Sequence, residues 1–167
     1  MNLAQKIGLM LMFCPVLGHA QWDVITHTGT NNNAETQVAY TQNEEGYSLE
    51  IYKDNVGAIR SRFSLNAALD MLAKRSCPTY QIDSTMLDNR SVNDAPCLTD
   101  LSWSEFILGY TENKVVTSEK LNALMNGGTI TFRFRLENGS YKETNFSLSG
   151  SKRATLSALG SDISIAP

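Results

Sequence analysis

Two stretches of the chain repeat one order of strands, turn and helix, and this repeat limits the folds open to it. Residues 45–73 read EGYSLEIYKDNVGAIRSRFSLNAALDMLA, and residues 127–159 read GGTITFRFRLENGSYKETNFSLSGSKRATLSAL. In both, apolar and polar residues alternate up to a turn with glycine, alternate again as far as Phe-Ser-Leu, and then take helical spacing. Alternation with a period of two indicates strands with one buried face, so each stretch is predicted to form a hairpin followed by a helix.

Short apolar segments after each helix extend the repeat to residues 46–83 and 128–166. Gly57 aligns with Gly139, and Phe63 aligns with Phe146. The second copy has one more residue in its return strand, where the apolar positions also change parity, and this pattern predicts a β-bulge. Asn138-Gly139 predicts a type I′ turn, since both central positions of that turn need a positive φ.

Helix ends are indicated by capping residues. Asn66 is predicted to cap a helix that carries Leu72. Thr117 or Ser118 is predicted to begin a helix that ends at Gly127. Ser149 or Ser151 is predicted to cap the last helix, which Gly160 ends. Further strands are expected at 37–40, 79–83, 103–110 and 162–166, and residues 27–36 are expected to form a polar loop.

These elements predict an α+β domain, mainly antiparallel β-sheet and sandwich-like, with short helices and two pseudo-repeated hairpin–helix–strand units. The strands are expected to form two sheets or one continuous sheet. Trp103 and Phe106 could form part of the core or of an exposed binding patch, and the core is the expected place for aromatic residues in a strand pattern.

The first twenty residues are predicted to be a secretory signal peptide. Lys6 supplies a positive charge, residues 7–18 are mostly apolar but too few to span a bilayer, and Gly18 and Ala20 place small residues before Gln21. Cleavage after Ala20 leaves one domain, residues 21–167, in the periplasm or secreted. No second apolar segment is long enough for stable membrane insertion.

Cys77 and Cys97 remain after this cleavage, and an even cysteine count in an exported chain predicts a disulfide. The pair bounds a polar loop from Pro78 to Pro96.

Composition and motifs argue against several function classes. The net charge of −3 gives no general attraction to nucleic acid. His27 is the one histidine outside the predicted leader, no Gly-x-Ser-x-Gly motif is present, and the acidic series from Asp83 to Asp100 lacks the spacing of a calcium loop. We therefore expect no enzyme activity, no cofactor and no metal site.

Candidate binding residues lie in two places. Arg133 and Arg135 share a face of one strand, and Lys142 on the return strand is expected to approach them. In the disulfide-bounded loop, the candidates are Asp88, Arg90 and Asp94.

The order of elements resembles the invasion-associated locus B family of bacterial envelope proteins. The resemblance rests on Trp22, on the strand pair YSLEIYKDNVGAIRSRFSL, on the helix SEKLNALMNGG, and on Phe146-Ser147-Leu148 followed by Gly150 and Ala154. It implies an exported bacterial protein with a β-rich domain, an association with host cells, and no catalytic residues.

Taken together, these features predict an exported, non-enzymatic domain that binds another protein in the envelope or at a host cell. A periplasmic inhibitor or immunity protein, acting through the loop between Pro78 and Pro96, remains an alternative. A small hydrolase built on His27 or on the aspartate loop is a second alternative.

Overall fold

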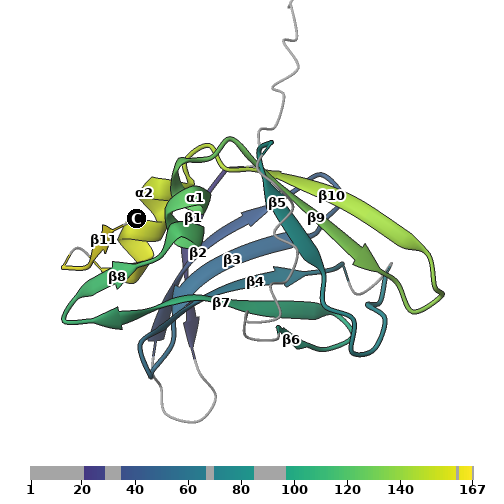
Figure 1. Cartoon of the computed structure of the whole chain (residues 1–167), viewed down its shortest axis with the longest axis horizontal. Coiled ribbons are helices and arrows are strands. Elements are labelled where there is room, and N and C mark those ends of the chain that lie inside the picture. Colours follow the sequence, from purple (N-terminus) through teal and green to yellow (C-terminus); the bar gives the residue numbers. More distant parts are fainter. Residues whose placement is uncertain (1–20, 29–34, 67–69, 85–96, 161, 167) are drawn as a thin grey trace, which may run out of the picture.

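The fold was obtained as a computed structural model, which describes residues 21–28, 35–66, 70–84, 97–160 and 162–166 (Figure 1). The predicted leader and most of the disulfide-bounded loop lie outside these ranges. Neither helix within them is long and apolar enough to cross a membrane.

Two sheets account for most of the described residues, so the predicted α+β class with mainly antiparallel strands is confirmed. The larger sheet has, in order, β1 (Asp23–Thr28), β2 (Glu35–Gln42), β3 (Ser48–Lys53), β4 (Ala58–Ser64), β7 (Trp103–Glu112), β8 (Val115–Thr117) and β11 (Ser164–Ala166), with β6 (Leu98–Thr99) also paired to β7. The smaller sheet has the order β10 (Tyr141–Ser147), β9 (Thr129–Arg135) and β5 (Thr79–Ile82). Only the β8–β11 pair is parallel among the described strand pairs.

One face of the curled larger sheet carries the core. The smaller sheet covers one end of this face, and the helices α1 (Glu119–Asn126) and α2 (Ser151–Leu159) cover the other (Figure 1). Phe63 of β4 stacks on Phe132 of β9 with ring centroids 4.5 Å apart, and Phe146 of β10 meets both rings edge-on. The aromatic side chains predicted on one face of each strand therefore join the two sheets.

Trp22 attaches the start of the described chain to this core. Its side chain is buried, and its indole Nε1 donates a hydrogen bond to the carbonyl oxygen of Ser147, 2.8 Å away. The residue before β1 is thus held by the end of β10.

Both predicted hairpins are confirmed, as β3–β4 and β9–β10. The helix predicted to run through Leu72 is wrong, because residues 70–73 are not helical. Leu72 instead forms a bridge to Leu136, and the amide of Ala73 donates to the carbonyl of Arg135. The amide of Leu72 donates to the carbonyl of Leu101, so the backbone groups of Leu72 and Ala73 bond to neighbouring segments and not within a helix. The pseudo-repeat itself stays a prediction.

The predicted bulge in β10 is wrong as well. Pairing with β9 is regular from Tyr141 opposite Arg135 to Ser147 opposite Thr129. Tyr141 is 77 % exposed and points outward, so the apparent change of parity came from counting it as a core residue. The irregular pairing occurs between β4 and β7, at Ile59 and Arg60.

The β9–β10 turn is not type I′. Gly139 has φ 89°, whereas Asn138 does not have a positive φ. The amide of Gly139 donates to the carbonyl of Leu136, and Leu136 pairs with Ser140, which gives a three-residue loop with a left-handed last residue. Gly57 occupies the same position between β3 and β4, as the alignment of the two copies predicts, but so does Gly46 between β2 and β3. The shared glycine therefore reflects a common hairpin loop rather than the repeat alone.

Of the predicted capping residues, some are confirmed and others are wrong. Ser118 caps α1, as predicted, with its hydroxyl accepting from the amide of Leu121. Neither Ser149 nor Ser151 caps α2, because Gly150 occupies the cap position with φ 91° and offers no side chain. Gly160 ends α2, as predicted.

Candidate functional site

Arg133 and Arg135 lie on the outer face of β9, where the sequence places them. Arg133 Nε lies 2.5 Å from Glu143 Oε2, and its Nη1 donates to Gln81. The guanidinium of Arg135 lies 5.9 Å from the centroid of the Tyr141 ring. Glu143 thus neutralises Arg133, and Arg135 is a second, exposed cation on this face.

Lys142 does not approach these arginines, so that expectation is wrong. It lies opposite Phe134 and therefore on the other face of the hairpin. Its Nζ lies 2.8 Å from Asp70 Oδ2 and 3.2 Å from the Tyr47 hydroxyl, which also donates to Asp70. The bonds from Lys142 and then Tyr47 hold the pKa of Asp70 below its ordinary value.

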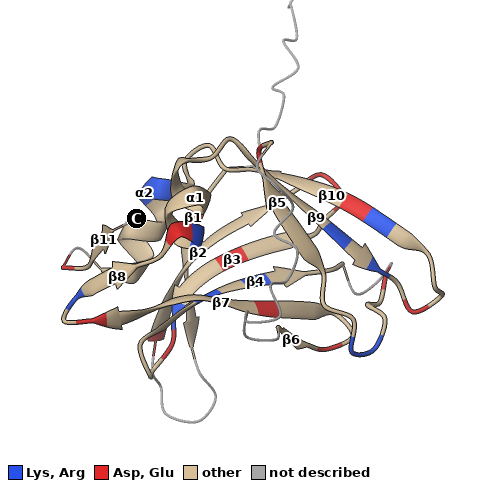
Figure 2. Ribbon diagram, in the orientation of Figure 1, with Lys and Arg blue, Asp and Glu red and all other residues tan. Residues whose placement is uncertain are grey.

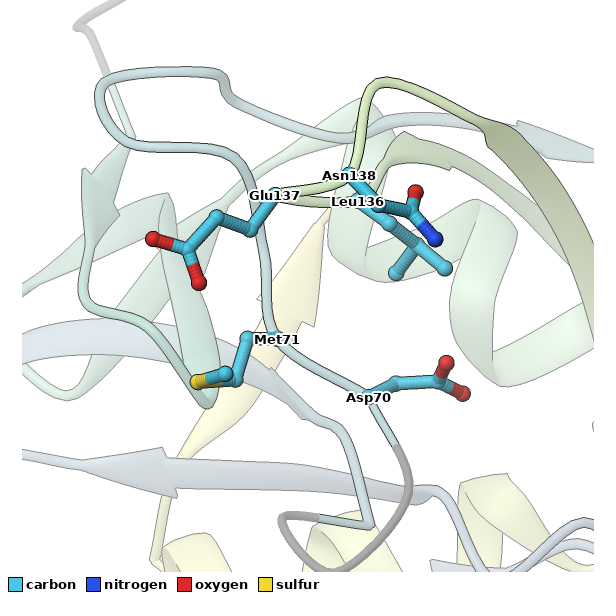
Figure 3. Close-up of a pocket in the computed structure, with 5 residues that line it drawn as sticks. All are labelled: Asp70, Met71, Leu136, Glu137 and Asn138. Carbon is cyan, nitrogen blue, oxygen red and sulfur yellow. The ribbon is translucent and has the colours of Figure 1, made fainter.

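An open cleft lies beside this group, between residues 70–71 and the β9–β10 turn. Its volume is about 330 Å³, and its lining residues are Asp70, Met71, Leu136, Glu137 and Asn138 (Figure 3). The amide of Glu137 donates to the carbonyl of Met71, which holds the two segments together. Lys142 and Tyr47 already occupy the Asp70 carboxylate, and the exposed Glu137 carboxylate is the other charged group in this lining.

Cys77 and Cys97 form a disulfide, as predicted, with their Cα atoms 6.0 Å apart. The candidate residues Asp88, Arg90 and Asp94 lie outside the described residues, as does most of the loop that the disulfide bounds.

A cluster of ion-paired side chains lies on the outer face of the larger sheet. Strand register places five residues directly opposite one another across five strands, in the order Tyr40, Glu50, Arg62, Glu105 and Leu98. Tyr52 and Arg60 form part of the next row. We call Glu50, Tyr52, Arg60, Arg62 and Glu105 the charged face. Figure 2 shows acidic and basic positions on β3, β4 and β7, the strands that carry these residues.

Glu105 is the centre of this face, although only 5 % of it is exposed. Its carboxylate accepts from Arg62 Nη2 at 2.8 Å, from Arg60 Nη1 at 2.7 Å and from the Tyr52 hydroxyl. Burial alone would raise the pKa of Glu105, but the bonds from Tyr52 and the two arginines outweigh burial and lower it. Burial and the bond to Glu105 raise the pKa of Tyr52. At neutral pH these two groups therefore form a fixed network and not an acid–base pair.

Arg62 is held between two aromatic rings. Its guanidinium carbon lies 4.9 Å from the Trp103 ring centroid and 5.6 Å from that of Tyr52. Trp103 is thus half-buried on the outer face, and the expectation that it lies in the core is wrong. Phe106 points the other way and packs partly buried against the core.

A small pocket opens beside Glu50 at one side of the charged face. Its volume is about 130 Å³, and its lining residues are His27, Thr36, Val38, Glu50, Tyr52 and Arg62. His27 and Thr36 belong to β1 and β2, so the loop expected at residues 27–36 is wrong at both of its ends, and residues 29–34 lie outside the described residues. Burial and then the charge of Glu50 raise the pKa of Tyr40, which lies opposite Glu50.

Sequence reasoning missed the charged face. Alternation does show that Glu50, Tyr52, Arg60 and Arg62 face away from the core, but the partner of the arginines comes from a strand 43 residues along the chain. In the part of the chain that the structure describes, no group of three or more His, Cys, Asp or Glu side chains could hold a metal ion.

No protein-family model matches the chain, and no curated protein or solved structure matches it either. The resemblance to invasion-associated locus B proteins therefore stays a prediction.

Proposed function

We propose that this chain is an exported, non-enzymatic protein-binding domain and that the charged face is its binding surface. The single observation that carries the proposal is the order imposed on Arg62, which Glu105, Tyr52 and Trp103 hold in one position. Arginine, tryptophan and tyrosine are the residue types that contribute most to protein–protein binding. Side chains that are already ordered lose little entropy when a partner binds.

Two further features support binding over catalysis at this face. Among the described residues, Nη1 of Arg62 has no hydrogen-bond partner, so an ordered donor remains for a partner. The directions of the pKa shifts leave Glu105 charged and Tyr52 protonated across the neutral range. The predicted leader and the disulfide support an exported location.

A capture experiment with matched variants tests this function. The oxidised chain would be immobilised and exposed to envelope, secreted and host-cell extracts, with bound proteins identified by mass spectrometry. We expect one saturable partner that is lost with Trp103→Ala, because this change removes one of the two rings that hold Arg62. The control is Tyr141→Ala, which removes the ring beside Arg135 on the other sheet.

Loss of the partner with both variants, or with neither, would contradict the assignment of this face. The partner's identity separates the alternatives, since an inhibitor would capture an enzyme and an envelope or host-interaction protein would not.

A further inference from the structure

Glu50 is a buried carboxylate without a hydrogen bond. Only 9 % of the residue is exposed, and none of the described residues donates a hydrogen bond to its side chain. Its nearest ionic partner is His27, whose Nε2 lies 3.8 Å from Oε1 and counts as a cation only when the imidazole is protonated. Burying a charge is unfavourable unless it is hydrogen-bonded, and the nearby Arg62 directs its Nε and Nη2 toward Glu105 and Tyr52, so the Glu50 carboxylate can still accept hydrogen bonds from a positive group of a ligand.

The neighbouring guanidinium groups are already paired with other carboxylates, so the negative charge of Glu50 is not neutralised by them. Arg60 contacts both Asp54, at 2.6 Å, and Glu105. Arg62 lies opposite Glu50 in the register but directs Nε and Nη2 toward Glu105. Two guanidinium groups therefore face three carboxylates, and the unmatched negative charge lies in the pocket.

The lining of the pocket indicates which cation fits. Glu50, the hydroxyl of Thr36 and the neutral imidazole of His27 provide hydrogen-bond acceptors from three adjacent strands. An ammonium group has three N–H donors, which matches these three acceptors. Val38, which is buried, and the Tyr52 ring provide an apolar wall for an alkyl chain.

The sixth lining residue is Arg62, whose Nε and Nη2 are turned toward Glu105. From this arrangement we infer that the pocket of His27, Thr36, Val38, Glu50, Tyr52 and Arg62 binds a primary ammonium group on a short alkyl chain. The volume of about 130 Å³ suits a group of this size. An anion would meet the Glu50 carboxylate. A hard metal ion prefers several oxygen ligands, and this pocket offers one carboxylate.

A lysine of the protein partner is the source that fits the proposed function, and to that extent the inference rests on it. A free alkylamine carries the same group. The pocket can be tested without the partner, so failure of one idea is distinguishable from failure of the other.

The test is a titration followed by two-dimensional ¹⁵N NMR, with the chain expressed with its own leader and purified in the oxidised form. The probes are Nα-acetyl-lysine N-methylamide, n-butylammonium, and Nα-acetyl-norleucine N-methylamide, which has the same stem without the charge. We expect the two amines to shift the amide signals of His27, Thr36 and Glu50 saturably, with a Kd of about 1 mM, and the norleucine probe to leave them unchanged.

Two variants and one control make the test specific. Glu50→Gln is expected to weaken amine binding at least about tenfold, since a hydrogen bond to a charged group is lost. Thr36→Val, which keeps the shape of the side chain, is expected to weaken it about threefold or more. Glu137→Gln, in the other cleft, is expected to change nothing. The dispersion of the amide signals checks that each variant is folded.

Equal shifts with the norleucine probe, or amine binding unaffected by both Glu50→Gln and Thr36→Val, would overturn the inference. If the amines bind but Glu50→Gln still captures the same protein partner, the pocket chemistry stands and its ligand is a free amine. If the amines fail to bind while capture depends on Trp103, the pocket inference fails and the proposed function stands.

Discussion

The Glu105 carboxylate accepts hydrogen bonds from two arginines and a tyrosine, so the charged face depends on this one side chain. Its removal leaves the partly buried guanidinium groups of Arg60 and Arg62 with less compensation. Glu105→Gln is therefore expected to lower the free energy of unfolding by about 2–3 kcal/mol. This loss is smaller than the one expected for a fully buried ion pair, because Arg62 is partly exposed. Urea denaturation measures this loss. Glu112→Gln, an exposed change on the same strand, should cost less than about 0.5 kcal/mol.

The same carboxylate gives the fold a dependence on acid. Because the pKa of Glu105 is lower in the folded chain than its ordinary value, the unfolded chain binds this proton more readily. The contribution is complete above about pH 5 and is lost as the pH falls below about 4. The stability gap between wild type and Glu105→Gln should therefore shrink between pH 7 and pH 3 in urea denaturation at each pH. A gap that stays constant would contradict the network.

At the scale of elements, α2 begins without a side-chain cap. Gly150 has φ 91°, a conformation that costs other residues about 1–2 kcal/mol. A Cβ at this position would lie 3.8 Å from Trp22, so space is not the obstacle. Gly150→Ala is expected to lower the free energy of unfolding by about 1–2 kcal/mol, while Ser149→Ala stays within about 0.5 kcal/mol. A larger effect of Ser149→Ala in thermal denaturation would restore the serine as the cap.

Elements with a clear period were predictable, and elements that depend on tertiary partners were not. The strands β3, β4, β9 and β10 follow from alternation, and α1 follows from its spacing and from Ser118. The segment around Leu72 has helical spacing as well, but its backbone bonds to residues near Leu136. Spacing alone cannot show that a neighbouring strand will supply these hydrogen bonds.

The candidate site illustrates the same limit. Which residues face outward on β3 and β4 can be read from the sequence, and this includes Glu50 and Arg62. Which of these outward charges is neutralised depends on the register between β4 and β7, and the sequence contains no local signal for that register. The expectation that Trp103 lies in the core rests on its being aromatic, although alternation along the strand places it on the opposite face from Phe106. Its contact with Arg62 exists only after the strands pair.

At the scale of the whole molecule, the disulfide connects the two sheets. Cys77 lies just before β5 of the smaller sheet, and Cys97 lies just before β6 at the side of the larger one. Closing this loop is expected to stabilise the fold by about 3 kcal/mol. Guanidinium denaturation with and without reductant measures the effect. The double variant Cys77→Ser/Cys97→Ser should match the reduced protein and be insensitive to reductant, and equal stability of oxidised and reduced wild type would contradict this role.

Trp22 has a consequence for the order of events if the chain is exported as proposed. If the leader is cleaved before Gln21, only one residue separates the cut bond from a side chain buried against β10. A peptidase needs several residues of accessible, extended backbone around the bond that it cuts. With Trp22 in place there is no such length on the carboxyl side of the bond. Maturation would then have to precede docking of the N-terminal strand, so the domain would complete its fold only after it has been released.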